Sequence, residues 1–172
     1  MQNENPREVR DLSQLESLLR AIEHGVVAFD GCTSAGKTTL MNELTGRLKY
    51  PAIDLDQHLN RQRGEFVNAL RLSELAAAIQ EALQQSPVAL IAGVCIREVL
   101  DRLQCDTVLH IYVQRNSPMG IPGDLDILDI EDGRQLGDMS LLSELDKEIA
   151  SYHARYCPRR NADVVYVRTG DD

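Results

Sequence analysis

The chain is best understood from one segment, Gly31-Cys32-Thr33-Ser34-Ala35-Gly36-Lys37-Thr38. This segment matches the pattern G-x-x-x-x-G-K-[ST], which binds phosphate groups when a strand precedes it and a helix follows it. An apolar run at residues 26–30 comes before it, and residues 38–48 carry leucine and methionine at helical spacing. The sequence therefore predicts a phosphate-binding loop between a buried strand and a helix.

The fixed residues of this loop each have a chemical reason. Gly31 and Gly36 let backbone N–H groups turn inward, in conformations that a Cβ atom obstructs. We expect Lys37 to neutralise the β- and γ-phosphates of ATP and the Thr38 hydroxyl to bind Mg²⁺. The helix that follows presents its positive N-terminal end to the same anion. The residues expected to hold the nucleotide are Gly31, Cys32, Thr33, Ser34, Ala35, Gly36, Lys37, Thr38 and Thr39.

Cys32 allows two interpretations. A helix N-terminus and Lys37 close by can lower the pKa of a thiol and make it reactive. Alternatively, Cys32 is a small residue that fills a variable loop position, and this second interpretation is the one we favour. The chain's four cysteines have no C-x-x-C spacing, which indicates a reduced, cytoplasmic setting rather than a disulfide framework.

Strands and helices are expected to alternate along the rest of the chain. The sequence predicts helices around residues 13–22, 72–83, 95–103 and 141–149, and further strands at 51–56, 88–92, 107–113 and 163–167. This alternation is typical of an α/β fold with a parallel, doubly wound sheet. The length of 172 residues fits a single domain spanning residues 1–172.

Composition excludes several classes of function. The net charge is −9 and the chain has no tryptophan, so it lacks the clustered cations and stacking rings that nucleic-acid binding requires. No apolar run approaches the roughly 20 residues of a membrane span. Nor do the D-x-x-G and N-K-x-D patterns of GTPases occur. We expect a small-molecule partner, whereas the sequence says nothing about oligomeric state.

Three segments resemble the uridine-kinase-like branch of P-loop kinases. Residues 29–39 are similar to the phosphate loop of that group, residues 52–59 to its second strand, and residues 152–165 to its closing helix and strand. The resemblance implies a five-stranded parallel sheet with helices on both faces and a lid. The reaction that it implies is ATP-dependent phosphorylation of the hydroxyl of a small molecule, possibly nucleoside-like.

Two carboxylates and one arginine are the further site residues. Asp56 matches the catalytic base of the resembling kinases, and a carboxylate at a strand end faces the ligand crevice of such a sheet. Asp54 lies one pleat back, as an alternative base or a ligand that supports Mg²⁺. Such kinases often carry an acid where this chain has Ala92, so Asp54 is expected to replace it. Arg115 follows the fourth strand and is expected to contact phosphate during catalysis.

The segment at residues 114–140 is expected to form a lid. Acidic residues crowd positions 124–132, either as a solvated lid face or as an acidic wall for a cationic acceptor such as an amino sugar. His153 is expected on the face of a helix. Two alternatives to a nucleoside-like kinase stay open: an ATP-binding regulatory domain or pseudo-kinase without turnover, motivated by Ala92, and an antibiotic phosphotransferase.

Overall fold

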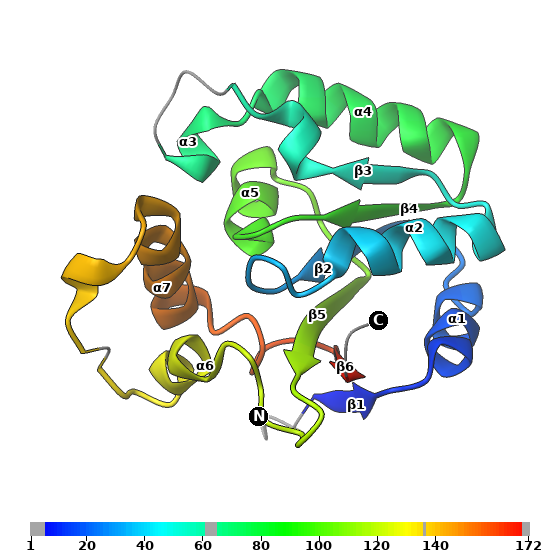
Figure 1. The fold of residues 1–172 in the computed structure, drawn as a ribbon. Helices are drawn as coiled ribbons and strands as arrows, with labels where there is room; N and C mark the ends of the chain where they lie inside the picture. The colour runs from blue at the N-terminus through cyan, green and yellow to red at the C-terminus, as the bar shows by residue number, and fades with distance from the viewer. Residues whose placement is uncertain (1–5, 61–64, 136, 170–172) are drawn as a thin grey trace, which may run out of the picture.

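A computed structural model describes residues 6–60, 65–135 and 137–169, and within these ranges six strands form one parallel sheet. The order of the strands is β1-β6-β5-β2-β4-β3, and every neighbouring pair is parallel. The strands are β1 (Arg7–Val9), β2 (Gly25–Asp30), β3 (Ala52–Asp54), β4 (Val88–Ala92), β5 (Leu109–Asn116) and β6 (Val164–Thr169). Their arrangement is shown in Figure 1.

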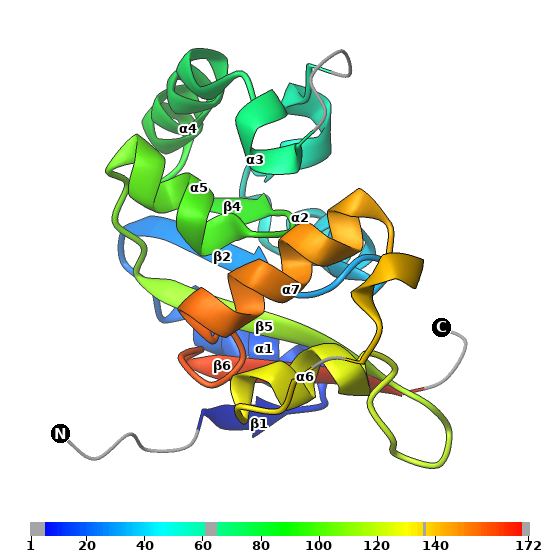
Figure 2. The ribbon, with the colours of Figure 1, turned by 90° about the vertical axis from the view of Figure 1, so that its left-hand side faces the viewer.

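Helices cover both faces of the sheet, as Figures 1 and 2 show. The helices are α1 (Leu12–Arg20), α2 (Lys37–Leu48), α3 (Phe66–Ala69), α4 (Leu72–Gln85), α5 (Ile96–Leu103), α6 (Leu125–Glu131) and α7 (Glu144–Tyr156), with 3₁₀ turns η1 (Leu55–His58) and η2 (Met139–Leu141). Side chains of α1 and α2 pack in one apolar cluster, and those of α3, α4, α5 and α7 in another. The doubly wound α/β architecture is therefore confirmed.

The central strand β2 explains why both faces must be covered. Val27 and Phe29 join the cluster beneath α1 and α2, whereas Val26 and Ala28 join the cluster on the opposite face. Successive side chains of a strand point to opposite faces, so a strand that is apolar throughout needs helices on both sides.

The expected number of five strands was wrong, because the described residues form a sixth strand at the edge of the sheet. This strand, β1, pairs with β6 in the register Arg7↔Val164 and Val9↔Tyr166. Only Val9 of its three residues is buried. A three-residue strand with two charged side chains has no alternation long enough to be detected, and it forms because β6 offers an unpaired edge.

The structure also moves the start of the lid that was expected at residues 114–140. Strand β5 extends to Asn116, and the buried side chain of Gln114 donates a hydrogen bond of 2.7 Å to that of Asn116. Helix α6 follows and buries Leu128 and Glu131, so its acids do not form a uniformly solvated face. A lid can therefore begin only after Asn116, and its movement stays a prediction. Leu136 lies outside the described residues.

Candidate active site

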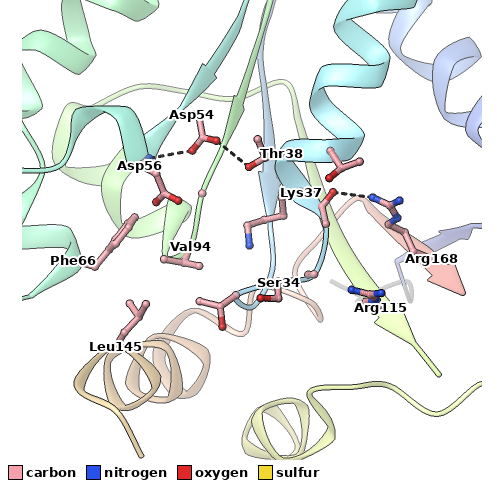
Figure 3. Close-up of a pocket in the computed structure, with 15 residues that line it drawn as sticks. Ser34, Lys37, Thr38, Asp54, Asp56, Phe66, Val94, Arg115, Leu145 and Arg168 are labelled. Atoms are coloured by element: carbon pink, nitrogen blue, oxygen red, sulfur yellow. Dashed lines mark hydrogen bonds between the residues drawn. The ribbon is translucent and has the colours of Figure 1, made fainter. Parts of the chain in front are cut away.

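The topology creates a crevice at the carboxyl end of β2. The loop after β2 leads to α2 on one face, whereas the loops after its neighbours β4 and β5 lead to helices on the other face. Ligands of open α/β sheets bind where connections diverge in this way. A pocket of about 510 Å³ lies there, lined by Thr33, Ser34, Ala35, Gly36, Lys37, Thr38, Thr39, Asp54, Asp56, Phe66, Gly93, Val94, Arg115, Leu145 and Arg168 (Figure 3).

The two glycines of the loop have the conformations that the motif predicts. Gly31 has a φ of 141°, and a Cβ atom there would lie 2.5 Å from the backbone oxygen of Val113. Gly36 has a φ of 89° and precedes the first residue of α2. Both values belong to the region that glycine adopts without strain. The loop can therefore pass close to β5 and still direct backbone N–H groups toward an anion.

Buried polar groups hold the base of the loop. Oδ1 of Asp30 accepts the N–H of Gly31 at 2.8 Å, and its Oδ2 accepts the hydroxyl of Tyr152. The ammonium of Lys37 donates to the backbone oxygens of Gly31 (2.9 Å) and Cys32 (2.5 Å). Burial lowers the pKa of Lys37, and the carboxylate of Asp30 opposes that shift. An incoming phosphate would replace uncharged carbonyls by a charged partner for this amine.

Thr38 and Asp54, the two residues predicted to bind Mg²⁺, are in contact. The hydroxyl of Thr38 donates to Oδ2 of Asp54 at 2.9 Å, and Oδ1 of Asp54 accepts the N–H of Asp56 at 3.0 Å. Asp54 also lies beside Ala92 in the pairing of β3 with β4. Ala92 is 1% exposed and packs within the cluster beneath α2. The carboxylate next to Thr38 therefore comes from β3 instead of β4.

These oxygen donors fit a magnesium ion that is shared with phosphate. Within the described ranges, no group of three or more histidine, cysteine, aspartate or glutamate side chains could hold a metal by itself. Mg²⁺ typically takes one or two protein oxygens and completes its shell with phosphate oxygens and water. Thr38 and Asp54 supply such a partial set at the mouth of the loop.

Asp56 lies at the start of η1, beyond the end of β3, and lines the same pocket. Its backbone N–H bonds to Asp54, so the orientation of the turn is fixed by its neighbour. Partial desolvation raises the pKa of the Asp56 carboxyl, and the negative charge of Asp54 raises it further. Both oxygens of Asp54 already accept hydrogen bonds, which leaves Asp56 the better placed of the two carboxylates to accept a proton.

Arg115 and Arg168 form a pair, and the sequence analysis identified only Arg115 as a site residue. They face each other in the register of β5 and β6, and Arg168 donates to the backbone oxygen of Gly36 at 3.0 Å. Figure 3 shows both guanidinium groups on one side of Lys37 and Asp56 on the other. Arg168 was missed, although it lies near the end of the last parallel strand, where site residues gather. The catalytic role of Arg115 stays a prediction.

Cys32 and Gly31, both expected to hold the nucleotide, are not among the residues that line the pocket. The sulfur of Cys32 is 3.6 Å from the hydroxyl of Tyr112 and 3.8 Å from Nε2 of His153. Burial raises the pKa of this thiol to about 12, which favours the small loop residue over the reactive thiol. His153 is 1% exposed, and its Nδ1 lies 2.7 Å from Oε1 of Glu131. His153 lies on helix α7, as expected, and its side chain is buried.

Three apolar residues complete the pocket, and none of them was singled out from the sequence. Phe66 of α3, Val94 after β4 and Leu145 of α7 line the same side as Asp56 (Figure 3). They come from three separate elements, so no local spacing connects them.

Among the described residues, no helix is long and apolar enough to cross a membrane.

No model of a known protein family matches this chain, and no curated protein is similar to it in sequence. Solved structures do match. A possible uridine kinase from Bacillus stearothermophilus superposes with a TM-score of 0.59 at 16% identity, over 90% of this chain and 96% of that one. A protein provisionally described as a fructose transport system kinase from Silicibacter sp. matches with a TM-score of 0.50 at 16% identity, over 92% and 100% of the two chains. The resemblance to P-loop kinases is thus confirmed at the level of the fold.

Proposed function

We propose that the chain is a P-loop kinase that transfers the γ-phosphate of ATP to a hydroxyl of a small, possibly nucleoside-like molecule. One observation carries the proposal. The pocket contains a complete phosphate loop, a Thr38–Asp54 pair at its mouth and a second carboxylate, Asp56, on the adjoining turn. Phosphoryl transfer needs these three parts: a phosphate cradle, oxygen donors for a metal, and a base for the acceptor.

The roles of the side chains follow from their positions. Lys37 and the loop N–H groups bind and orient the β- and γ-phosphates, and Thr38 with Asp54 would hold Mg²⁺, which would supply charge neutralisation to the phosphates. Asp56 accepts the proton of the attacking hydroxyl. Arg115 and Arg168 lie on the other side of Lys37, which suits contacts with the donor nucleotide. The acceptor then enters on the side of Asp56.

The regulatory alternative was motivated by the absence of an acid at Ala92. Asp54 lies on the adjacent strand and accepts a hydrogen bond from Thr38, so an oxygen donor is present without that acid. The motivation for a domain that binds ATP without turnover is correspondingly weaker. No contact among the described residues favours an antibiotic acceptor over another small alcohol.

Turnover against defined acceptors tests the proposal. Purified protein is incubated with Mg²⁺, γ-labelled ATP and one of uridine, cytidine, fructose or glucosamine, and the labelled product is identified by mass spectrometry. We expect acceptor-dependent label transfer, with glucosamine reporting on the cationic acceptor that an acidic wall would favour. ATP binding without label transfer to any of these acceptors would overturn the proposal and support the regulatory alternative.

Asp54→Ala is expected to raise the Mg²⁺ concentration required for half-maximal rate by about 10–100-fold, the usual effect of a residue that supports a metal ligand. The substitution removes the acceptor that holds the Thr38 hydroxyl in place. A Mg²⁺ titration of initial rate measures the change. Asp106→Ala, which lies outside the pocket lining, is the control and should titrate as the wild type does. Superposable curves for Asp54→Ala and the wild type would remove Asp54 from the metal site.

A further inference from the structure

A carboxylate on α7 bonds to the start of α3, far away in the sequence. Oε2 of Glu148 accepts the N–H of Phe66 at 2.8 Å, and Oε1 accepts the N–H of Val67 at 3.0 Å. Each oxygen takes one donor, so the two bonds fix the carboxylate plane relative to the α3 backbone. Hydrogen bonds to an ionised acceptor are about twice as strong as those between neutral groups. None of the proposed chemical steps uses Glu148.

The two ends of α3 are held by different parts of the molecule. At its C-terminal end, the N–H of Asn60 donates to the backbone oxygen of Ala69 at 2.7 Å, and Leu70 bridges to Leu59. These bonds tie that end to the chain that follows Asp56. At its N-terminal end, Glu148 ties α3 to α7. The helix therefore spans the distance between the turn that carries Asp56 and the helix that follows the expected lid.

The position of α3 determines one wall of the pocket. Phe66 is 9% exposed and lines the pocket with Val94 and Leu145. Leu145 precedes Glu148 by one helical turn, so the two side chains share a face of α7. The face that supplies Leu145 to the wall thus also holds the backbone of Phe66. Figure 3 shows the three apolar side chains gathered on the side of Asp56.

We infer that Glu148 is a positioning residue for the phosphoryl acceptor. By holding α3 against α7, it keeps Phe66 and Leu145 together as an apolar wall beside Asp56. Such a wall binds an alcohol that has a flat or apolar face, in the part of the pocket beside the carboxylate. This inference rests on the proposed kinase function. Glu148 acts through Phe66 and does not touch the reacting atoms.

The test compares Glu148→Gln and Glu148→Ala with Glu144→Gln. Glu144 lies on the same helix, is exposed and pairs with Lys147 at 2.7 Å, so it controls for a change of charge on α7. Of the four compounds uridine, cytidine, fructose and glucosamine, the acceptor is the one that the wild type phosphorylates most efficiently. Rates are measured against acceptor at saturating ATP and against ATP at saturating acceptor. Amide hydrogen exchange at Phe66 and Val67 is followed in the same proteins.

We expect both Glu148 variants to raise the KM for the acceptor, by about 10–100-fold for Glu148→Ala, because a charge-assisted pair of hydrogen bonds is lost. The kcat and the KM for ATP should stay near wild-type values, since uniform acceptor binding is what is removed. Exchange at the two amides should accelerate in Glu148→Ala and stay unchanged in Glu144→Gln.

Three results would overturn the inference. An unchanged acceptor KM in both Glu148 variants, with turnover intact, rejects it while leaving the kinase function standing. Equal increases in the KM for acceptor and ATP indicate a general structural defect and reject it as well. A wild-type protein that phosphorylates none of the four acceptors rejects the proposed function, and this inference with it.

Discussion

Asp56→Asn is expected to slow phosphoryl transfer by about 10²–10⁴-fold, the usual contribution of a positioned general base. Asparagine keeps the size of the side chain and cannot accept the proton of the attacking hydroxyl. The backbone N–H that bonds to Asp54 is retained, so the turn that follows β3 should keep its conformation. Nucleotide binding should be nearly unchanged, because Asp56 is separate from the loop that holds the phosphates.

The pH dependence of the rate gives an independent check on this base. The base must be ionised to work, and desolvation together with Asp54 raises the pKa of Asp56 above its ordinary value. The wild-type rate should therefore fall as the pH drops through that raised pKa, and this acid limb should disappear in Asp56→Asn. Initial rates between pH 4 and 8, with acceptor at saturation, measure both effects. A large loss in Asp54→Asn with a harmless Asp56→Asn would reassign the base to Asp54.

Local sequence was sufficient wherever one short segment specified both a conformation and a chemistry. The loop at residues 31–38 has the predicted strand before it and helix after it, and β4 has the predicted bounds Val88–Ala92. The structure also brings Thr38 and Asp54 into contact, and their support of a metal stays a prediction. The placement of these residues has one cause, since parallel strands have their carboxyl ends at one edge of the sheet. Strand order alone then brings the residues together.

Pairings between distant segments were beyond local patterns. His153 and Glu131 form a buried pair, and Glu131 also accepts the N–H groups of Arg159 and Arg160 at 3.2 and 2.9 Å. From their own segments alone, the acids of α6 indicate a solvated face or an acidic wall, and His153 indicates only a residue on a helix face. Each burial is acceptable because hydrogen-bond partners come from other segments of the chain. The spacing of charges within a single segment cannot reveal such a partner.

Lys37→Ala is expected to abolish the thermal stabilisation that Mg²⁺-ATP gives to the wild type. A ligand at 100 times its Kd stabilises the folded state by about 2.7 kcal/mol. Lys37 is the cation that the loop itself directs at the β- and γ-phosphates, and its buried ammonium donates to two backbone carbonyls, at 2.9 and 2.5 Å, that phosphate oxygens can replace. Loss of this charge removes the main electrostatic attraction at the centre of the pocket. Melting temperatures with and without Mg²⁺-ATP measure the effect.

Lys37 is 8% exposed and its stem is part of the interior, so Lys37→Ala changes packing as well as charge. One further variant separates these two effects, and a second serves as a control. Lys37→Met keeps an unbranched stem of similar length without the ammonium, so it should also lose the response to Mg²⁺-ATP while melting close to the unliganded wild type. Lys147→Ala removes a lysine that pairs with Glu144 outside the pocket and should respond as the wild type does. If Lys37→Ala and Lys37→Met were both stabilised by Mg²⁺-ATP as strongly as the wild type, the loop would not be the phosphate site. If only Lys37→Ala lost the response, the stem of Lys37 and not its charge would be what nucleotide binding requires.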